Sequence, residues 1–285
     1  MTQHLFATVV TGTAVAANNR GEGDGSTLST LQKITFGNEQ FTTVSAEAIR
    51  WGLREYLQNL DPTQVNRIFD AETKGGIYEY KDETFSADQY VDDDLFGFMN
   101  AKKGSKDEDA TVKRRGAVEV TRAISLDPFL GDVSFGSRGG QKDRTSIYGN
   151  EMHLTAYQYS VALTPASLKQ PSRAALLLDA LAAVRHVGGN HARFLYDFTP
   201  ESIALRVTVD PAPWILNCFE RQQGQAIDCA RLVALVTASD VDAKEIILGG
   251  AIASTASAEQ LKQLGAEVHL GVKQAIAAVK ARLTA

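Results

Sequence analysis

The sequence predicts an α+β fold. Two patterns support this: runs rich in β-branched or alternating apolar residues, typical of strands, and apolar stripes at helical spacing. In chain order they predict strand Leu5–Ala16, helix Ala46–Asn59, strands Arg114–Ile124 and Met152–Thr164, helix Ser172–Val187 and strand Glu201–Asp210. This order of strand, helix, strand, strand, helix and strand is ferredoxin-like, with interruptions after the first helix and between the second and third strands.

The first predicted helix carries two arginines away from its apolar stripe. Ser45 is suited to cap its N-terminus. Arg50 and Arg54 lie one turn apart on a face of their own. They could contact a ligand, or they could form a solvated face paired with Glu47 and Glu55, and the sequence leaves both readings open.

The predicted third strand places Tyr157 and Tyr159 on one face. Aromatic side chains on an open sheet face can stack nucleic-acid bases. The alternative is that both tyrosines pack beneath a helix. The sequence favours this second reading slightly.

Residues 61–112 predict an insertion and not a separate domain, because the segment is irregular and polar. Asp92, Asp93 and Asp94 are adjacent, whereas the acids of a metal-binding loop usually alternate with other residues. A helix start or a loop is therefore the favoured role for them. The tract Ala101–Asp109 predicts a disordered connector.

No cofactor or metal is predicted. The loop Asn18–Ser26 is glycine-rich, but its spacing differs from nucleotide-binding motifs, so a plain mobile loop is as good a reading. His186 and His191 have no further ligand nearby. Cys218 and Cys229 lack metal-ligand spacing and are expected to be reduced thiols. The remaining segment, residues 216–285, predicts a C-terminal α/β extension without a catalytic signature.

Charge points to a local basic surface. The 285 residues carry a net charge of −5, which argues against coating nucleic acid by bulk charge. Between Lys113 and Arg144, however, the chain carries seven cationic and four anionic side chains. This fits a phosphate-binding surface, although a solvated hairpin has the same composition. The N-terminus predicts a strand and not a signal peptide, and no stretch reaches the ~18–20 apolar residues of a membrane helix, so a cytoplasmic protein without membrane contact is expected.

Four stretches together resemble the DevR-type backbone subunit of type I-B CRISPR Cascade complexes. They are NNRGEGDGSTLSTLQKITFG, TTVSAEAIRWGLREY, DDDLFGFM and RRGAVEVTRAISLDPFLGD. The resemblance implies an RRM-like palm (residues 1–60 and 113–215), a finger insertion (61–112) and a thumb hairpin (about 126–150). It implies a non-catalytic subunit that binds the guide crRNA, oligomerises along it and presents it to target DNA, with each thumb displacing a base. The other implied partners are further Cascade subunits: the one that caps the crRNA 5′ end, and the large and small subunits.

The same resemblance implies RNA-binding residues in five places. They are Asn19 and Arg20 after the first strand, Arg50 and Arg54 on the first helix, Arg114 and Arg115 at the second strand, Phe135, Arg138, Lys142 and Arg144 in the thumb, and Gly188, Gly189 and Arg193 in a glycine-rich loop. Arginine offers phosphate a planar fork of donors, and glycine lets backbone N–H groups approach it. An apolar thumb residue, Phe135 or Ile147, is expected to wedge between bases.

Two other functions stay open. Related type III backbone subunits cut target RNA with an acid after the first strand, and Asp24 lies in a comparable loop. A ferredoxin-like protein that binds a small ligand and no nucleic acid is the second alternative.

Overall fold

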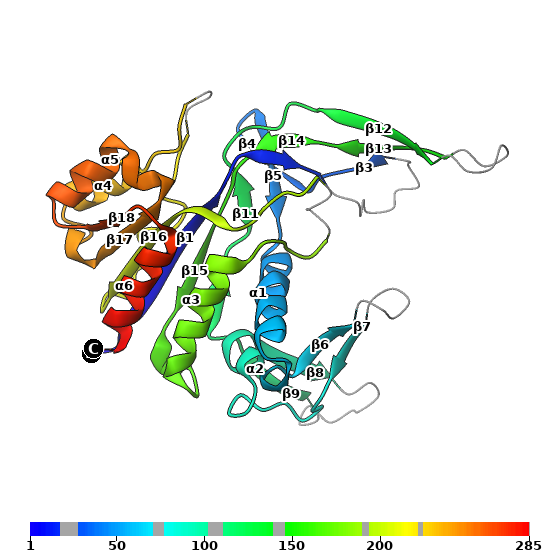
Figure 1. Ribbon diagram of the computed structural model, residues 1–285, viewed down its shortest axis with the longest axis horizontal. Helices are drawn as coiled ribbons and strands as arrows, with labels where there is room; N and C mark the ends of the chain where they lie inside the picture. Colours follow the sequence, from blue (N-terminus) through cyan, green and yellow to red (C-terminus); the bar gives the residue numbers. More distant parts are fainter. Residues whose placement is uncertain are drawn as a thin grey trace.

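The computed structural model describes residues 1–17, 28–70, 77–101, 111–138, 146–189, 194–221 and 225–284, and its centre is a nine-stranded sheet (Figure 1). The order along this sheet is β18 (Glu267–His269), β17 (Ile246–Gly250), β16 (Pro200–Thr208), β1 (His4–Thr11), β15 (Tyr157–Leu163), β11 (Ala123–Ser125), β5 (Glu39–Val44) and β4 (Lys33–Phe36), and β10 (Val118–Val120) also pairs with β15.

The four predicted palm strands are neighbours in the middle of this sheet. β1 is antiparallel to both β15 and β16, so that Val9 lies opposite Tyr159 on one side and Ile203 on the other. The spatial order of the predicted strands is therefore fourth, first, third and second, the arrangement of a split β-α-β fold. The predicted α+β class is confirmed.

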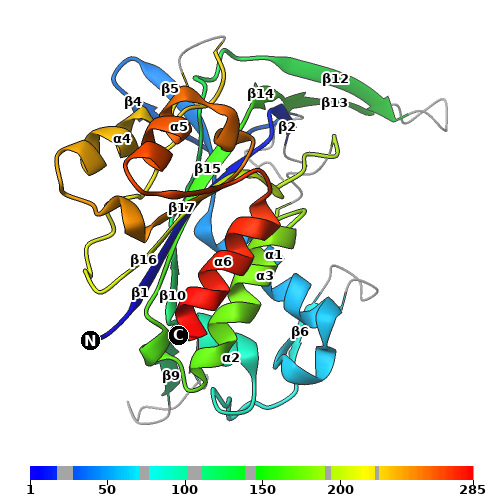
Figure 2. The same cartoon turned by 60° about the vertical axis from the view of Figure 1, so that its left-hand side comes forward.

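Helices cover both faces of the sheet (Figures 1 and 2). They are α1 (Ala46–Leu60), α3 (Ala174–Ala183) and α6 (Val272–Thr284) on one face, and α4 (Ala230–Thr237) and α5 (Ala256–Gln263) on the other. Because side chains alternate along a strand, Leu5, Ala7 and Val9 of β1 join the core under α1, α3 and α6, while Phe6 and Val10 join the core under α4 and α5. The extension beyond residue 216 thus enlarges the sheet and covers its second face.

The prediction of one continuous second strand was wrong. That stretch contains the end of β9 (Thr111–Arg115), then β10 and β11. β9 pairs with β8 (Gly97–Ala101) in the insertion and not with the palm sheet. The break falls at Gly116, where an added Cβ would lie 2.6 Å from the carbonyl oxygen of Phe96, so only glycine fits. Arg114 and Arg115 consequently belong to the finger.

Other palm elements are also shorter than predicted, and the predicted third strand, Met152–Thr164, divides into β14 (His153–Thr155) and β15. The first strand ends at Thr11, and the chain resumes as β2 (Ala14–Ala16), which pairs with β14 outside the main sheet. The second helix ends at Ala183, because the backbone becomes extended at Val184 and crosses to α1.

Tyr157 and Tyr159 pack beneath the helices. Both have no exposed surface and belong to the core under α1, α3 and α6. Burial raises the pKa of Tyr157 to about 12, so its hydroxyl stays protonated and bonds to Thr42 Oγ1 at 2.7 Å. The reading in which these tyrosines stack bases is therefore wrong.

The finger insertion consists of two hairpins and a short helix. Its elements are the 3-10 turn Pro62–Gln64, β6 (Arg67–Asp70), β7 (Ile77–Tyr80), α2 (Val91–Phe96) and the β8–β9 hairpin. The three aspartates begin α2, as favoured. Asp92 accepts hydrogen bonds from the backbone N–H groups of Asn66 and Arg67, at 2.8 and 3.0 Å, which ties the helix to the start of β6. The predicted connector Ala101–Asp109 lies almost wholly outside the described residues.

The thumb projects from one end of the sheet (Figure 1). It is the antiparallel pair β12 (Val133–Arg138) and β13 (Ser146–Glu151), with β3 (Leu28–Ser29) parallel to β13. None of the helices in the described part of the chain is long and apolar enough to cross a membrane.

Candidate nucleic-acid interface

The glycine-rich loop lies directly on α1. Gly188 donates its backbone N–H to the carbonyl oxygen of Ala48 at 3.0 Å. An added Cβ on Gly52 would lie 2.3 Å from the carbonyl oxygen of His186, so glycine on the helix lets the loop approach. Gly189 follows with a φ of +83°, a conformation that suits glycine. The expected contact of the Gly188 N–H with phosphate needs correction, because this donor is used inside the protein.

α1 also carries Arg50, and two residues near the loop, Trp51 and His186, have contacts that the sequence did not indicate. The Arg50 guanidinium is 3.9 Å from Glu47, a loose pair that matches the solvated reading. Glu55 pairs with His186 at 2.6 Å. The half-buried Trp51 ring lies 5.7 Å from the His186 ring, centre to centre. The sequence suggests metal binding as the one role to weigh for His186, and only the fold brings this residue to α1.

Arg54 and Arg114 both face α2. The Arg54 guanidinium lies over the Phe96 ring, 4.7 Å from its centre. Arg114 donates to Asp94 Oδ1 at 2.9 Å and to the carbonyl oxygen of Ser167 at 3.2 Å. These contacts join the finger to the palm. Arg54 and Arg114 thus have structural roles in the described protein, and their phosphate contacts stay predictions.

Arg115 lies apart from the Arg50 surface. It is exposed and pairs with Glu119. It also lines a groove of about 670 Å³ together with Phe6 and Pro213. Since Phe6 belongs to the core under α4 and α5, this groove opens on the sheet face opposite α1. Among the predicted cations that the structure describes, Arg50 and Arg115 thus lie on different surfaces.

The thumb carries an exposed apolar pair on one side. Phe135 is 78% exposed and Ile147 is 63% exposed. In the hairpin register Phe135 lies opposite Gly149 and Ile147 opposite Ser137, which puts both side chains on the same face. Tyr148 packs over Gly136 on the other face. The expected wedge residues are thus presented to solvent on one face of the hairpin.

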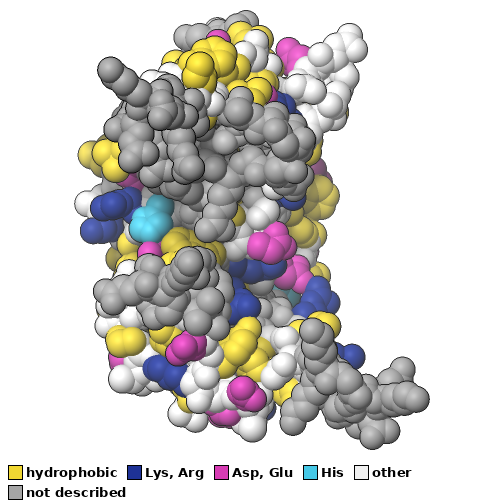
Figure 3. Space-filling model, turned by 90° about the vertical axis from the view of Figure 1, so that its right-hand side faces the viewer, with side chains coloured by type: hydrophobic (Ala, Val, Ile, Leu, Met, Phe, Trp, Pro, Cys, Tyr) yellow, Lys and Arg dark blue, Asp and Glu magenta, His cyan; other side chains and the backbone are white. Residues whose placement is uncertain are grey.

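Several predicted residues lie outside the described ranges. They are Asn19, Arg20, Asp24, Lys142, Arg144 and Arg193; the backbone of Arg138 ends β12. Figure 3 shows the face that lies on the right in Figure 1. On it the described Lys and Arg side chains form separate groups, one of them beside a histidine, and not one band. Within the described ranges, His, Cys, Asp and Glu side chains do not gather in a group of three that could hold a metal ion.

Comparison with known proteins identifies the family. The model of the CRISPR-associated negative auto-regulator DevR/Csa2 matches residues 13–172. The chain belongs to the DevR/Csa2 family. The DevR-type resemblance of the sequence is thereby confirmed. A protein of Myxococcus xanthus (strain DK1622), described as CRISPR-associated protein Cas7/Cst2/DevR, is 42% identical over 302 residues, covering 99% of this chain and 98% of the relative.

Solved structures share the fold of this DevR/Csa2 protein. A chain of a CRISPR RNA-guided surveillance complex in a pre-nicking state has a TM-score of 0.65 at 12% identity, over 98% of this chain and all of that chain. A chain of another CRISPR RNA-guided surveillance complex has a TM-score of 0.59 at 15% identity, over 98% and 99%. The similarity spans the palm, the insertions and the C-terminal extension together.

Proposed function

We propose that this protein is a non-catalytic crRNA-binding backbone subunit of a type I-B Cascade surveillance complex. The observation that carries the proposal is the 42% identity, over nearly its whole length, to a Cas7/Cst2/DevR protein. The full-length fold similarity to chains of RNA-guided surveillance complexes supports it. In this role copies assemble along one guide in the cytoplasm. The guide then pairs with target DNA, and the other Cascade subunits complete the complex.

Two surfaces of the protein suit this role. α1 offers the cation of Arg50, and the next residue, Trp51, packs its ring near that of His186; charge and rings together suit a sugar–phosphate strand with its bases. The thumb offers Phe135 and Ile147, whose exposure leaves them free to enter a base stack. Both kinds of contact are indifferent to sequence, as binding of arbitrary guides requires.

Co-expression with a guide RNA tests the proposal directly. The purified protein is expected to retain RNA. Retained RNA is seen as an absorbance at about 260 nm that exceeds the absorbance at about 280 nm. It is also expected to elute as an assembly far larger than one chain of 30.8 kDa. A folded protein that stays a monomer and leaves its guide unbound at low salt would refute the proposal and favour the small-ligand alternative.

The non-catalytic part has its own test. The assembled protein is incubated with an RNA complementary to the guide in the presence of Mg²⁺. We expect the RNA to stay intact. Regular cleavage that disappears in Asp24→Ala would show instead that this subunit is a nuclease of the type III kind.

A further inference from the structure

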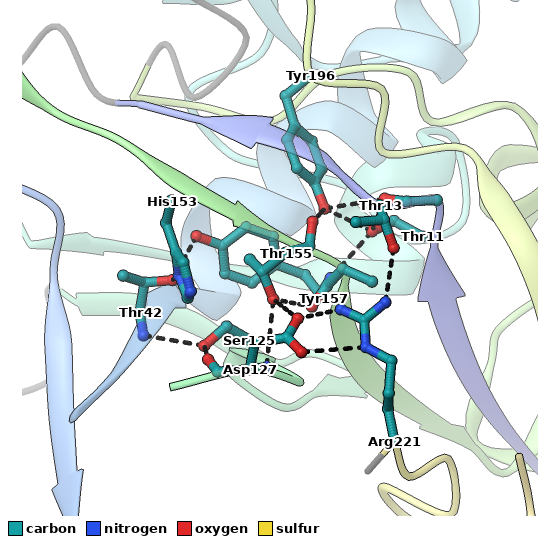
Figure 4. Close-up of polar contacts among 12 residues, drawn as sticks. Thr11, Thr13, Thr42, Ser125, Asp127, His153, Thr155, Tyr157, Tyr196 and Arg221 are labelled. Atoms are coloured by element: carbon teal, nitrogen blue, oxygen red, sulfur yellow. Dashed lines mark hydrogen bonds and ion pairs between the residues drawn. The ribbon is translucent and has the colours of Figure 1, made fainter. Parts of the chain in front are cut away.

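Asp127 lies where the palm sheet gives way to the thumb, two residues beyond the end of β11 (Figure 4). Arg221 binds its carboxylate with two donors, Nε to Oδ1 at 3.1 Å and Nη2 to Oδ2. Thr155 Oγ1 donates to Oδ2 at 2.8 Å. Because Asp127 precedes β12 and Thr155 follows β13, this carboxylate connects the two chain segments at the base of the thumb hairpin.

The same guanidinium reaches a second segment. Arg221 Nη1 donates to Thr13 Oγ1 at 2.7 Å. Thr13 lies between β1 and β2, on the stretch that leads to the predicted RNA-binding residues Asn19 and Arg20. Arg221 thus connects the base of the thumb to the chain that follows the first strand.

Tyr196 brings a third segment to the same place. Its hydroxyl lies 2.7 Å from Thr11 Oγ1 and 3.0 Å from the carbonyl oxygen of Thr155. Its side chain is buried, and burial raises the pKa of its hydroxyl, so the group stays a neutral hydrogen-bond partner. Tyr196 follows the glycine-rich loop that ends in Arg193. Figure 4 shows the three segments converging around Thr155 and Arg221.

The ion pair at the centre is largely removed from water. The side chain of Arg221 is 11% exposed and that of Asp127 is 22% exposed. A bidentate pair of this kind has a fixed geometry, since the planar fork of arginine matches the two carboxylate oxygens. A binding site whose parts come from separate segments needs such a support to hold them at a constant spacing.

We infer that Asp127 and Arg221 are positioning residues for guide binding. The pair sets the thumb relative to the chain after the first strand and to the glycine-rich loop. It thereby fixes where along the guide each copy displaces a base. This inference rests on the proposed function, and neither side chain needs to touch RNA.

The test uses assembled complexes of Asp127→Asn, Arg221→Gln and the double variant. The measurement is the chemical reactivity of every guide base, normalised to the amount of RNA retained. The single variants are expected to lose the regular pattern of displaced, reactive bases while still retaining guide. The double variant removes both charges, so no buried charge is left unpaired and folding is expected to recover, but the pattern is expected to stay lost because the fork is absent.

A matched control breaks a comparable ion pair far from the thumb. Arg206 is 2% exposed and its Nε lies 2.8 Å from Glu245 Oε2. Glu245→Gln is expected to lower thermal stability and leave the pattern of reactive bases unchanged. If the wild type retains guide with a regular pattern and all three thumb-base variants keep that pattern, the inference is wrong while the proposed function stands. A wild type that retains no guide would overturn both.

Discussion

Arg173 Nη1 lies 2.9 Å from Asp94 Oδ2, and both side chains are buried where the finger meets the palm. The other oxygen of Asp94 accepts from Arg114 of β9 at 2.9 Å. One carboxylate therefore joins α2, the finger hairpin and the start of α3. Such a pair contributes to stability only while it is complete, because removing one partner leaves the other as a buried, uncompensated charge.

Asp94→Asn is accordingly expected to destabilise the protein by about 3–5 kcal/mol, since it leaves the two arginines uncompensated. Urea unfolding followed by circular dichroism measures the change. Asp88→Asn, an exposed aspartate in the same insertion, serves as the control and is expected to change the free energy of unfolding little. Equal effects of the two substitutions would contradict the role assigned to Asp94.

The raised pKa of Asp93 predicts that the stability of the protein depends on pH. Burial raises its pKa from 3.8 to about 6, although Ser86 N–H and Asn66 Nδ2 both donate to Oδ2 at 3.0 Å. A carboxyl whose pKa is raised by folding costs stability once it ionises, so its unfavourable contribution grows as pH rises from about 4 to 6 and persists above. Asp93→Asn keeps an oxygen for both donors. It should stabilise the protein more at pH 7.5 than at pH 4.5, as measured by thermal unfolding at the two pH values.

Arg50→Glu tests the α1 surface. We expect this variant to retain less guide, and the salt dependence of RNA binding to become shallower by about one unit in the slope of log K against log salt. The control, Lys262→Glu, makes the same charge change on α5, on the opposite side of the sheet. Retention of wild-type guide in Arg50→Glu would remove Arg50 from the interface. Arg54→Glu is not a clean test, because it also breaks the contact with Phe96.

Phe135→Ala tests the thumb. Because Phe135 is 78% exposed, its loss should change the free energy of unfolding by no more than about 0.5 kcal/mol. It should nevertheless reduce the reactivity of the displaced guide bases. Leu270→Ala, at an exposed site in the C-terminal extension, controls for the loss of exposed apolar surface. An unchanged base pattern in both Phe135→Ala and Ile147→Ala would show that the wedge lies elsewhere.

Gly52→Ala tests the seating of the glycine-rich loop. The new methyl group would lie 2.3 Å from the carbonyl oxygen of His186, so the loop must move, at a cost of about 1–3 kcal/mol. A lower melting temperature together with reduced guide retention is the expected result. Gly271→Ala in the C-terminal extension is the control, since the nearest atom to its added Cβ is a side-chain oxygen of Gln274 at 3.4 Å. If Gly52→Ala retains as much guide as the control does, the seating of the loop does not contribute to RNA binding.

Local patterns were sufficient for the class and order of the main elements. Alternation in Glu201–Asp210 and the apolar stripe of α1 follow from periods of two and 3.6 residues, which neighbouring residues impose on each other. The cap at Ser45 is equally local, and its side chain does accept from the N–H of Ala48, at 3.1 Å. The family resemblance likewise depended on short stretches that are visible in the sequence alone.

Which cations face solvent was decided by tertiary structure. Arg50 and Arg54 are equivalent by helical spacing, yet only Arg54 lies over Phe96, a residue more than forty positions away in sequence. Arg114 became an internal partner of Asp94 because Gly116 ends its strand early and leaves it in the finger hairpin. The convergence of Asp127, Thr155 and Arg221 likewise requires the sheet to bring distant segments together. Sequence determines the local backbone through near neighbours, whereas a charged group's partner depends on contacts that form only when the whole chain has folded.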